Sequence, residues 1–236
     1  MIRFEHIHKR YNLGNTRFTA IDDVSLEIAQ GEFMALAGPS GSGKTTLLNI
    51  AGCLEKPDRG RVWIEGEDVT GIPLAALAAK RRSRLGFVFQ TFNLVPVLTA
   101  FENVEYPLML GGAPRRARQA VVTIWLDRVG LTPHAGQRPD QLSGGQRQRV
   151  AIARAMVASP AVVIADEPTA NLDSATTVNI LDLLEQINRE TATTFLIATH
   201  DPLVMERATR TVMMRDGRIV SPERGTPAKA ERALAC

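Results

Sequence analysis

The stretch at residues 33–46, FMALAGPSGSGKTT, constrains the fold of this chain most strongly. Its apolar start, 33–37, predicts a short buried strand, and residues 46–54 predict a helix. The loop between them fits the pattern G-x-x-x-x-G-K-[ST], which is typical of a phosphate-binding loop. Its glycines let backbone N–H groups turn toward phosphate oxygens, and the helix N-terminus adds partial positive charge. We therefore expect a nucleoside triphosphate site.

The residue types in this loop match distinct parts of such a ligand. Lys44 supplies a full positive charge for the outer phosphates, and the Thr45 hydroxyl is suited to hold Mg²⁺. A ligand-free glycine and serine turn is the alternative, which the strand–loop–helix context disfavours. The expected nucleotide-binding residues are Gly38, Pro39, Ser40, Gly41, Ser42, Gly43, Lys44, Thr45 and Thr46.

Composition excludes several other classes of protein. The 236 residues, 44% hydrophobic, suffice for one large domain or two small ones. The 28 basic and 25 acidic residues give a net charge of +3, without the concentrated basic face of a nucleic-acid binder. Cys53 and Cys236 show no metal-site spacing, which is consistent with a reduced cytosolic protein. The chain opens on the strand-like IRFEHIH, so no signal is expected, and its apolar runs are too short to cross a bilayer.

Four apolar runs each lead directly into polar residues. They are 33–37 before the phosphate loop, 86–89 before Gln90, 162–165 before Asp166 and Glu167, and 194–198 before His200. Apolar runs that alternate with helices predict a parallel sheet covered on both faces. Ligands of such sheets bind at the carboxyl ends of the strands, so we expect these polar side chains in one crevice.

The remaining elements surround this sheet. Residues 1–28 predict two or three strands with a loop near 12–15, and 62–67 predict a hairpin. A helix is expected at 74–84, and residues 95–159 look helical, with breaks at Pro107, Gly111-Gly112 and Pro133. A helix at 174–190, a short helix from 202, a hairpin turning at 216–217 and a polar tail from 221 complete the expected order.

Two further segments carry candidate chemistry. Asp166 is placed to hold Mg²⁺ opposite the phosphate loop, and Glu167 to act as general base toward water. An ordinary strand-ending turn is the alternative. The segment LSGGQ, 142–146, opens a helix and forms a second candidate anion site. Ser143 as a simple N-cap is the alternative, but that leaves the choice of two glycines over better helix formers unexplained.

Together these motifs resemble the ordered motif set of an ABC-transporter ATPase subunit. The matching segments are 38–45, Gln90, 142–146, 162–167, 171–173 and His200. Tyr11 matches the aromatic residue that stacks on adenine in the family. The wording PTANLDS, FVFQTFNLVPVLTAFENV and LSGGQRQRVAIARA resembles the branch that serves lipoprotein release, macrolide export and cell division. Ala170 departs mildly from this branch, where glycine is usual.

The resemblance implies an α/β fold: a P-loop NTPase (RecA-like) core with a parallel sheet, an N-terminal antiparallel β subdomain and an inserted helical subdomain. It implies one ABC ATPase domain at 1–220, with the helical insertion at about 95–159, and a polar tail at 221–236. The implied cofactors are ATP and Mg²⁺, with Thr45, Gln90 and Asp166 at the metal. The residues implied in catalysis are Glu167, His200, Gln90 and Lys44.

The resemblance also implies partners. Two copies would form a homodimer on ATP, in which the segment Ser143, Gly144, Gly145 and Gln146 of one copy meets the γ-phosphate bound by the other. Asp173 would link the two sites, and His200 would contact the γ-phosphate. Integral-membrane permease subunits would dock near residues 90–110, on the cytoplasmic face of the cell membrane. The transported substrate is not readable, because the membrane subunit would recognise it.

Two other functions remain as alternatives. A soluble ABC ATPase acting on nucleic acid or ribosomes would carry coiled-coil insertions or tandem halves, and this chain has one copy of each motif. A non-hydrolysing scaffold would lack Glu167 or Lys44, and both are present. The basic residues Arg81, Arg82 and Arg84 indicate a solvated helix face, with contact to anionic lipid headgroups as the alternative.

The apolar segment 91–110 contains Pro96 and Pro107, so we do not expect one buried helix or strand there. Its apolar side chains cannot all reach the core of a small helical subdomain. We therefore expect some of them to form an exposed groove for an amphipathic helix of the membrane subunit. The residues in question are Phe92, Leu94, Val97, Leu98, Phe101 and Tyr106.

Overall fold

The structure is a computed structural model that describes residues 1–14, 16–220 and 224–225. Its N-terminal part forms an antiparallel sheet in the strand order β2-β1-β4-β5. The strands are β1 (Ile2–Leu13), β2 (Thr16–Ile28), β4 (Arg59–Ile64) and β5 (Glu67–Asp68). Along β1, Ile2 and Phe4 are buried while Arg3 between them is exposed, so one face of the sheet packs inward. The predicted N-terminal strands and the hairpin at 62–67 are confirmed.

A second sheet forms the core, in the order β10-β9-β3-β8-β7-β6, with β11 beside β9. Its strands are β3 (Phe33–Ala37), β6 (Leu85–Val88), β7 (Val162–Asp166), β8 (Thr194–Thr199), β9 (Arg210–Arg215), β10 (Arg218–Ile219) and β11 (Arg224–Gly225). The four predicted apolar runs are neighbours in it and run parallel. Every residue of β3 and β8 is buried, which explains their continuous apolar sequences.

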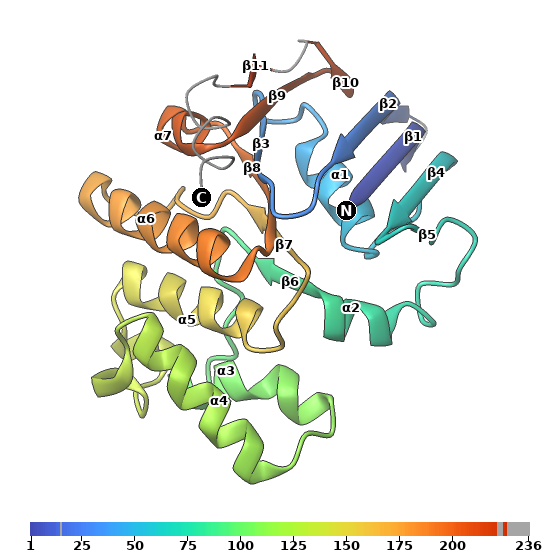
Figure 1. The fold of residues 1–236 in the computed structure, drawn as a ribbon. Coiled ribbons are helices and arrows are strands. Elements are labelled where there is room, and N and C mark those ends of the chain that lie inside the picture. Colours follow the sequence, from blue (N-terminus) through green and yellow to red (C-terminus); the bar gives the residue numbers. More distant parts are fainter. Residues whose placement is uncertain (15, 221–223, 226–236) are drawn as a thin grey trace, which may run out of the picture.

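Helices cover this core sheet (Figure 1). They are α1 (Lys44–Ala51), α2 (Ala78–Arg84), α3 (Ala100–Leu110), α4 (Arg115–Arg128), α5 (Gly144–Met156), α6 (Ser174–Thr191) and α7 (Pro202–Arg207), with 3-10 turns at Thr132–His134 and Pro139–Gln141. The helices α3, α4 and α5 pack together on the far side of the molecule from the antiparallel sheet. No helix in the described part of the chain is long and apolar enough to span a bilayer.

The alternating side chains of the core strands build two separate hydrophobic clusters. Phe33 and Phe195 point to the face covered by α5 and α6, and their rings lie 5.5 Å apart. Met34 and Leu196, their neighbours in sequence, point to the opposite face, where α1 and the antiparallel sheet pack. The sheet is therefore buried on both faces, so its polar ligand-binding groups can emerge only at strand ends. This mixed α/β fold confirms the expected fold class.

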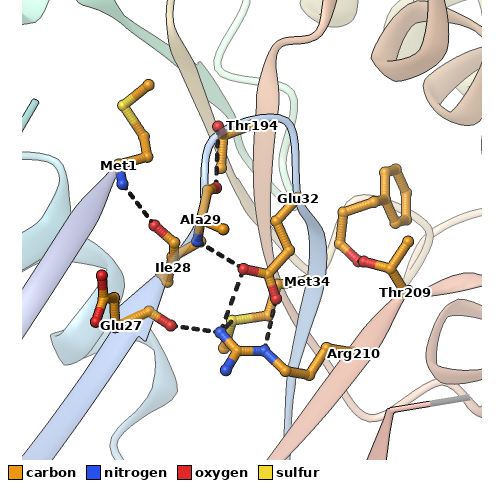
Figure 2. A network of polar contacts seen from close by, with 10 residues as sticks. Met1, Glu27, Ile28, Ala29, Glu32, Met34, Thr194, Thr209 and Arg210 are labelled. Carbon is orange, nitrogen blue, oxygen red and sulfur yellow. Dashed lines mark hydrogen bonds and ion pairs between the residues drawn. The ribbon is translucent and has the colours of Figure 1, made fainter. Parts of the chain in front are cut away.

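A polar joint connects the two sheets where the chain turns from β2 into β3 (Figure 2). The Arg210 guanidinium, on β9, donates to the Glu32 carboxylate at 2.5 Å and to the Glu27 carbonyl. The same carboxylate accepts from the Ala29 N–H at 2.7 Å, and the Ala29 carbonyl accepts from the Thr194 hydroxyl at 3.5 Å. The turn is therefore hydrogen-bonded to both β8 and β9, and these bonds attach the antiparallel sheet to the core sheet.

Two expectations about helix boundaries were wrong. The helix expected at 74–84 begins only at Ala78, because the Leu74 carbonyl accepts from the Arg81 guanidinium at 2.7 Å instead of from a helical N–H. Pro107 does not break α3 but lies within it. A proline removes one helical N–H, and α3 ends three residues later, where the Gly111 N–H donates to the Pro107 carbonyl at 3.1 Å. The tail from 221 lies almost entirely outside the described residues.

Candidate nucleotide site

The glycine-rich loop lies between β3 and α1, at the carboxyl edge of the core sheet. Gly38 has φ +152°, and a Cβ there would lie 2.1 Å from the Met214 carbonyl oxygen. Gly43 has φ +101°, and a Cβ there would lie 2.4 Å from the Ala20 carbonyl oxygen. Both positions therefore require glycine for conformation and for space. Gly43 precedes α1 without a side-chain cap, so the first N–H groups of α1 remain available for a ligand.

Lys44 is folded over this loop. Its side chain is buried, and its ammonium donates to the carbonyls of Gly38 at 2.7 Å and Pro39 at 3.0 Å. These bonds hold a full positive charge next to the uncapped helix N-terminus. An anionic ligand would therefore meet the ammonium and the backbone N–H groups together.

Asp166 ends β7 opposite the loop. Its Oδ2 accepts from the Thr45 hydroxyl at 2.9 Å, while its buried Oδ1 has no hydrogen-bond partner among the described residues. Burial raises the pKa of the Asp166 carboxyl, and the hydrogen bond from Thr45 acts in the opposite direction. Mg²⁺ takes hard oxygen ligands, commonly one or two carboxylates together with substrate phosphates and water. The unpaired carboxylate oxygen beside the Thr45 hydroxyl fits this donor set.

Glu167 and His200 form a pair across the ends of β7 and β8. The His200 Nδ1 lies 2.8 Å from Glu167 Oε1, which is within hydrogen-bonding distance. The second oxygen, Oε2, is buried and has no partner among the described residues. Glu167 adopts φ +48°, and its N–H donates to the Ala198 carbonyl at 3.0 Å. Residues held in this conformation by their surroundings concentrate at functional sites.

These groups meet at one cavity of about 340 Å³. It is lined by Phe18, Ala20, Ser40, Gly41, Gly43, Lys44, Thr45, Thr46, Gln90, Asp166, Glu167 and His200. The structure therefore brings together loop residues and the polar ends of three further strands, as the sequence pattern predicted. The remaining candidates do not line this cavity: Tyr11, Gly38, Pro39, Ser42, Ser143, Gly144, Gly145, Gln146 and Asp173.

The chain after Gln90 is held by two side chains, Asn171 and Arg154, to which the motif analysis assigned no role. The Asn171 amide donates to the Gln90 carbonyl at 2.9 Å. Phe92 and Asn93 both have left-handed φ, 63° and 49°, and Arg154 donates to their carbonyls at 2.7 and 2.5 Å. Burial lowers the pKa of Arg154. An arginine inside the otherwise apolar run AIARA was the available signal, but the sequence could not show which loop Arg154 holds.

The LSGGQ segment forms a capping box at the start of α5. Ser143 Oγ accepts from the Gln146 N–H at 3.2 Å, and Gln146 Oε1 accepts from the Ser143 N–H at 2.8 Å. A Cβ at Gly145 would lie 2.6 Å from Thr176 Cγ2, whereas a Cβ at Gly144 would make ordinary contacts from 3.5 Å. Close packing against α6 therefore accounts for Gly145 but not for Gly144.

Asp173 caps the helix α6. Its carboxylate accepts from the Thr176 N–H at 2.9 Å and from the Thr176 hydroxyl at 2.7 Å. These hydrogen bonds lower the pKa of Asp173. The side chain is therefore ionised at neutral pH and positioned by its own helix.

Tyr11 lies in β1 and is hydrogen-bonded to the segment that follows α1. Its hydroxyl donates to the Glu55 carboxylate, and the Lys9 ammonium lies 5.5 Å from the centroid of its ring. Burial, followed by the bond to Glu55, raises the pKa of Tyr11. Adenine stacking on Tyr11 stays a prediction.

A sequence profile described as ABC transporter matches residues 21–170, which is more than half of the chain. The chain belongs to the ABC transporter family. The motif resemblance found in the sequence is therefore confirmed.

Relatives of this ABC transporter chain carry names from the expected branch. It is 45% identical over 219 residues to the "Lipoprotein-releasing system ATP-binding protein LolD" of Bordetella avium, covering 93% of this chain and 95% of that protein. It is 44% identical over 228 residues to the "Macrolide export ATP-binding/permease protein MacB" of Syntrophobacter fumaroxidans. That match covers 95% of this chain and only 32% of the relative, so the chain spans about a third of the macrolide export protein.

Two solved structures of the cassette MJ0796 share the fold of this ABC transporter chain. One is described as a dimeric post-hydrolysis state bound to ADP and Pi, the other as a dimeric bacterial ABC transporter cassette. Each superposes with a TM-score of 0.88 at 41% identity, covering 95% of this chain and 98% of that chain. This similarity confirms an ABC cassette fold.

Proposed function

We propose that this ABC cassette binds and hydrolyses ATP as the subunit that powers a membrane transporter or mechanotransmission complex. One observation carries the proposal: Asp166 and Glu167 line the cavity that also holds Lys44, and each has a carboxylate oxygen with no hydrogen-bond partner among the described residues. The first suits a metal ion and the second a water molecule, and both lie beside a phosphate-binding loop. The ADP and Pi bound in the homologous cassette support the same chemistry.

Binding follows from the charge arrangement. Phosphate oxygens would accept from the N–H groups of the loop and of the α1 N-terminus, and from Lys44, which exchanges its bonds to the loop carbonyls for bonds to the ligand. Thr45, Asp166 and Gln90 would hold Mg²⁺, which offsets negative charge on the phosphates when it is bound.

Hydrolysis requires a group that positions water and takes its proton. Glu167 Oε2 would accept the proton while the water oxygen bonds to the γ-phosphorus and the bond to the β–γ bridging oxygen breaks, giving ADP and phosphate. His200 occupies the other oxygen of Glu167 and so fixes the direction of the carboxylate. The imidazole also stands at the cavity wall, where it can contact the γ-phosphate.

The hydrolysis proposal is tested with Glu167→Gln, which keeps the shape of the side chain but cannot act as a base. Mg-ATP should still bind, and turnover should fall at least about a hundredfold. Glu206→Gln, an exposed change on α7, is the matched control and should keep wild-type turnover. Near-normal turnover of the purified Glu167→Gln protein would assign the base elsewhere.

A second copy of the chain would complete each site. Ser143 and Gly145 stand at the start of α5 and do not line the cavity of their own chain, and the MJ0796 cassette is dimeric. ATP should therefore convert the Glu167→Gln protein from monomer to dimer, because the γ-phosphate would lie between two helix N-termini. A light-scattering mass that stays monomeric at saturating Mg-ATP would contradict this arrangement.

A membrane subunit would dock beside residues 90–110. A groove of about 440 Å³ lies between α2, α3 and the segment after Gln90. Its apolar wall includes Phe87, Phe89, Tyr106 and Leu110, and Leu110 is 54% exposed. Of the side chains expected there, Tyr106 lines the groove and Val97 is exposed, whereas Leu94 and Phe101 pack against the core. An amphipathic helix fits such a groove.

This docking site is tested by charge at its rim. Leu110→Glu should prevent association with the membrane subunit, while the free cassette keeps its ATPase activity. Ile124→Glu, which changes an equally exposed side chain on α4 outside the groove, is the control and should leave association intact. Co-purification of the Leu110→Glu protein with its membrane subunit would place the interface elsewhere.

A further inference from the structure

One aromatic side chain of the nucleotide cavity has no counterpart among the predicted site residues. Phe18, on β2, lines the cavity and is 48% exposed, whereas Tyr11 does not line it. The strand is pressed against the phosphate loop at this place, because the Ala20 carbonyl would lie 2.4 Å from a Cβ at Gly43. The backbone of β2 two residues after Phe18 is therefore held close to the phosphate loop.

Phe18 and Tyr11 are direct partners in the antiparallel ladder between β1 and β2. Directly opposite residues place their side chains on the same face of the sheet, with Cβ atoms about 4.5–5.5 Å apart. The two rings therefore project from one face. The Tyr11 hydroxyl donates to Glu55 and the Lys9 ammonium lies over the Tyr11 ring, while Phe18 lines the cavity.

The residues that line the cavity differ in their chemistry. Lys44, Thr45, Asp166, Glu167 and His200 supply charged and polar groups. Phe18 carries the one phenyl ring among the described lining residues, so it provides a flat apolar surface beside them. A nucleotide has the same division, with an anionic phosphate chain and a flat base whose π-face stacks on aromatic rings.

We propose that Phe18 is a nucleobase-binding residue, and that it presents its ring to the base alongside Tyr11. This inference rests on the proposed ATP binding and adds a second aromatic contact to it. Stacking does not read the hydrogen-bonding edge of a base, so Phe18 contributes affinity for purine nucleotides without discriminating ATP from GTP.

The test compares ligands with and without a base, using calorimetry on the purified chain. Phe18→Ala should weaken Mg-ATP and Mg-GTP binding by about tenfold or more, and leave binding of inorganic tripolyphosphate with Mg²⁺ unchanged. Phe18→Trp should restore ATP affinity, and Phe18→Leu should restore only part of it, since leucine is apolar but has no ring. Ile124→Ala, which removes an exposed apolar side chain elsewhere, is the control.

The outcomes separate this inference from the function on which it rests. Unchanged ATP affinity in Phe18→Ala would overturn the inference alone, provided that the wild-type chain binds Mg-ATP. Equal losses of ATP and tripolyphosphate affinity would also overturn it, because Phe18 would then act by supporting the loop. Failure of the wild-type chain to bind either ligand would remove the proposed function itself.

Discussion

The helices α1 and α5 begin in opposite ways, although both carry glycines at an N-terminus that could bind phosphate. α1 follows a left-handed Gly43 and has no side-chain cap. α5 follows Ser143, whose side chain forms a reciprocal capping box with Gln146. The first helix thus leaves N–H groups open to a ligand, whereas the second satisfies part of its own N-terminus.

This difference suits the two helices to different roles: α1 to binding nucleotide within its own chain, and α5 to contacting a nucleotide that another copy has bound. The loop at α1 supplies donors and a buried ammonium, so it can bind nucleotide within one chain. Ser143 Oγ accepts from Gln146 but keeps its own hydrogen to donate. The N-cap role and the phosphate-contact role of Ser143, which looked like alternatives in the sequence, are therefore compatible in one geometry.

Removing the charge at α1 tests this comparison most severely. Lys44→Ala should lower Mg-ATP affinity by about a hundredfold, because a buried ammonium makes strong charge-assisted bonds to phosphate. Ser143→Ala should leave the ATP affinity of the isolated monomer unchanged. Calorimetry on both variants decides the point, and a comparable loss in Ser143→Ala would mean that α5 contributes to binding within one chain.

Removing the side-chain cap of α5 should lower the stability of the fold only slightly, but it should prevent dimerisation. Ser143→Ala should lower the free energy of unfolding by about 1 kcal/mol and prevent the ATP-dependent dimer of the Glu167→Gln protein. Thr99→Ala is the matched control, because Thr99 and Glu102 form the same capping box on α3. It should cost about the same stability in urea unfolding. Loss of the dimer in Thr99→Ala as well would make the assembly effect one of stability alone.

Alanine substitutions at the two glycines of LSGGQ, Gly144 and Gly145, should affect stability differently. Gly145→Ala places a Cβ against Thr176 Cγ2 and should cost about 1 kcal/mol of unfolding free energy, which Thr176→Ser should largely restore. Gly144→Ala meets only ordinary contacts and should leave stability unchanged or raise it by up to about 1 kcal/mol. If Gly144→Ala still weakens the ATP-dependent dimer, its glycine serves the ligand and not the fold.

The smallest effect concerns pH. Hydrogen bonds from the Thr99 N–H and hydroxyl lower the pKa of Glu102 from its ordinary 4.5. The stabilisation is therefore present above pH 4.5 and is lost as the pH falls through the lowered pKa. Glu102→Gln should cost only about a few tenths of a kcal/mol at pH 7, because the group is exposed, and the difference should shrink as the pH falls below 4.5 through the lowered pKa of Glu102. α5 should show no such dependence, since its box uses Gln146. A difference between wild type and Glu102→Gln that does not change with pH would contradict this.

Much of the fold could be predicted from local patterns. β3, β7 and β8 are largely continuous apolar runs, so a buried parallel sheet could be predicted. Because the carboxyl ends of parallel strands meet at one edge of a sheet, the polar residues that follow these strands could be predicted to lie together. Helix boundaries that depend on side-chain contacts could not be predicted. The Arg81 guanidinium donates to the Leu74 carbonyl, and α2 is shorter than expected. The position of Phe18 at the cavity could not be predicted from the sequence either, because it depends on the β1–β2 register and on the close approach of Ala20 to the phosphate loop.

The pairing of β7 with β8 has a consequence for how such a site can evolve. Asp166 lies opposite Ala198 in the ladder, and Glu167 and His200 extend just beyond this pair. Their separation is therefore inherited from the spacing of neighbouring strands, about 4.7–4.9 Å, which backbone hydrogen bonds set without reference to side chains. Apolar substitutions along both strands can accumulate without changing it. A lineage can thus replace most of its core and retain the same chemistry.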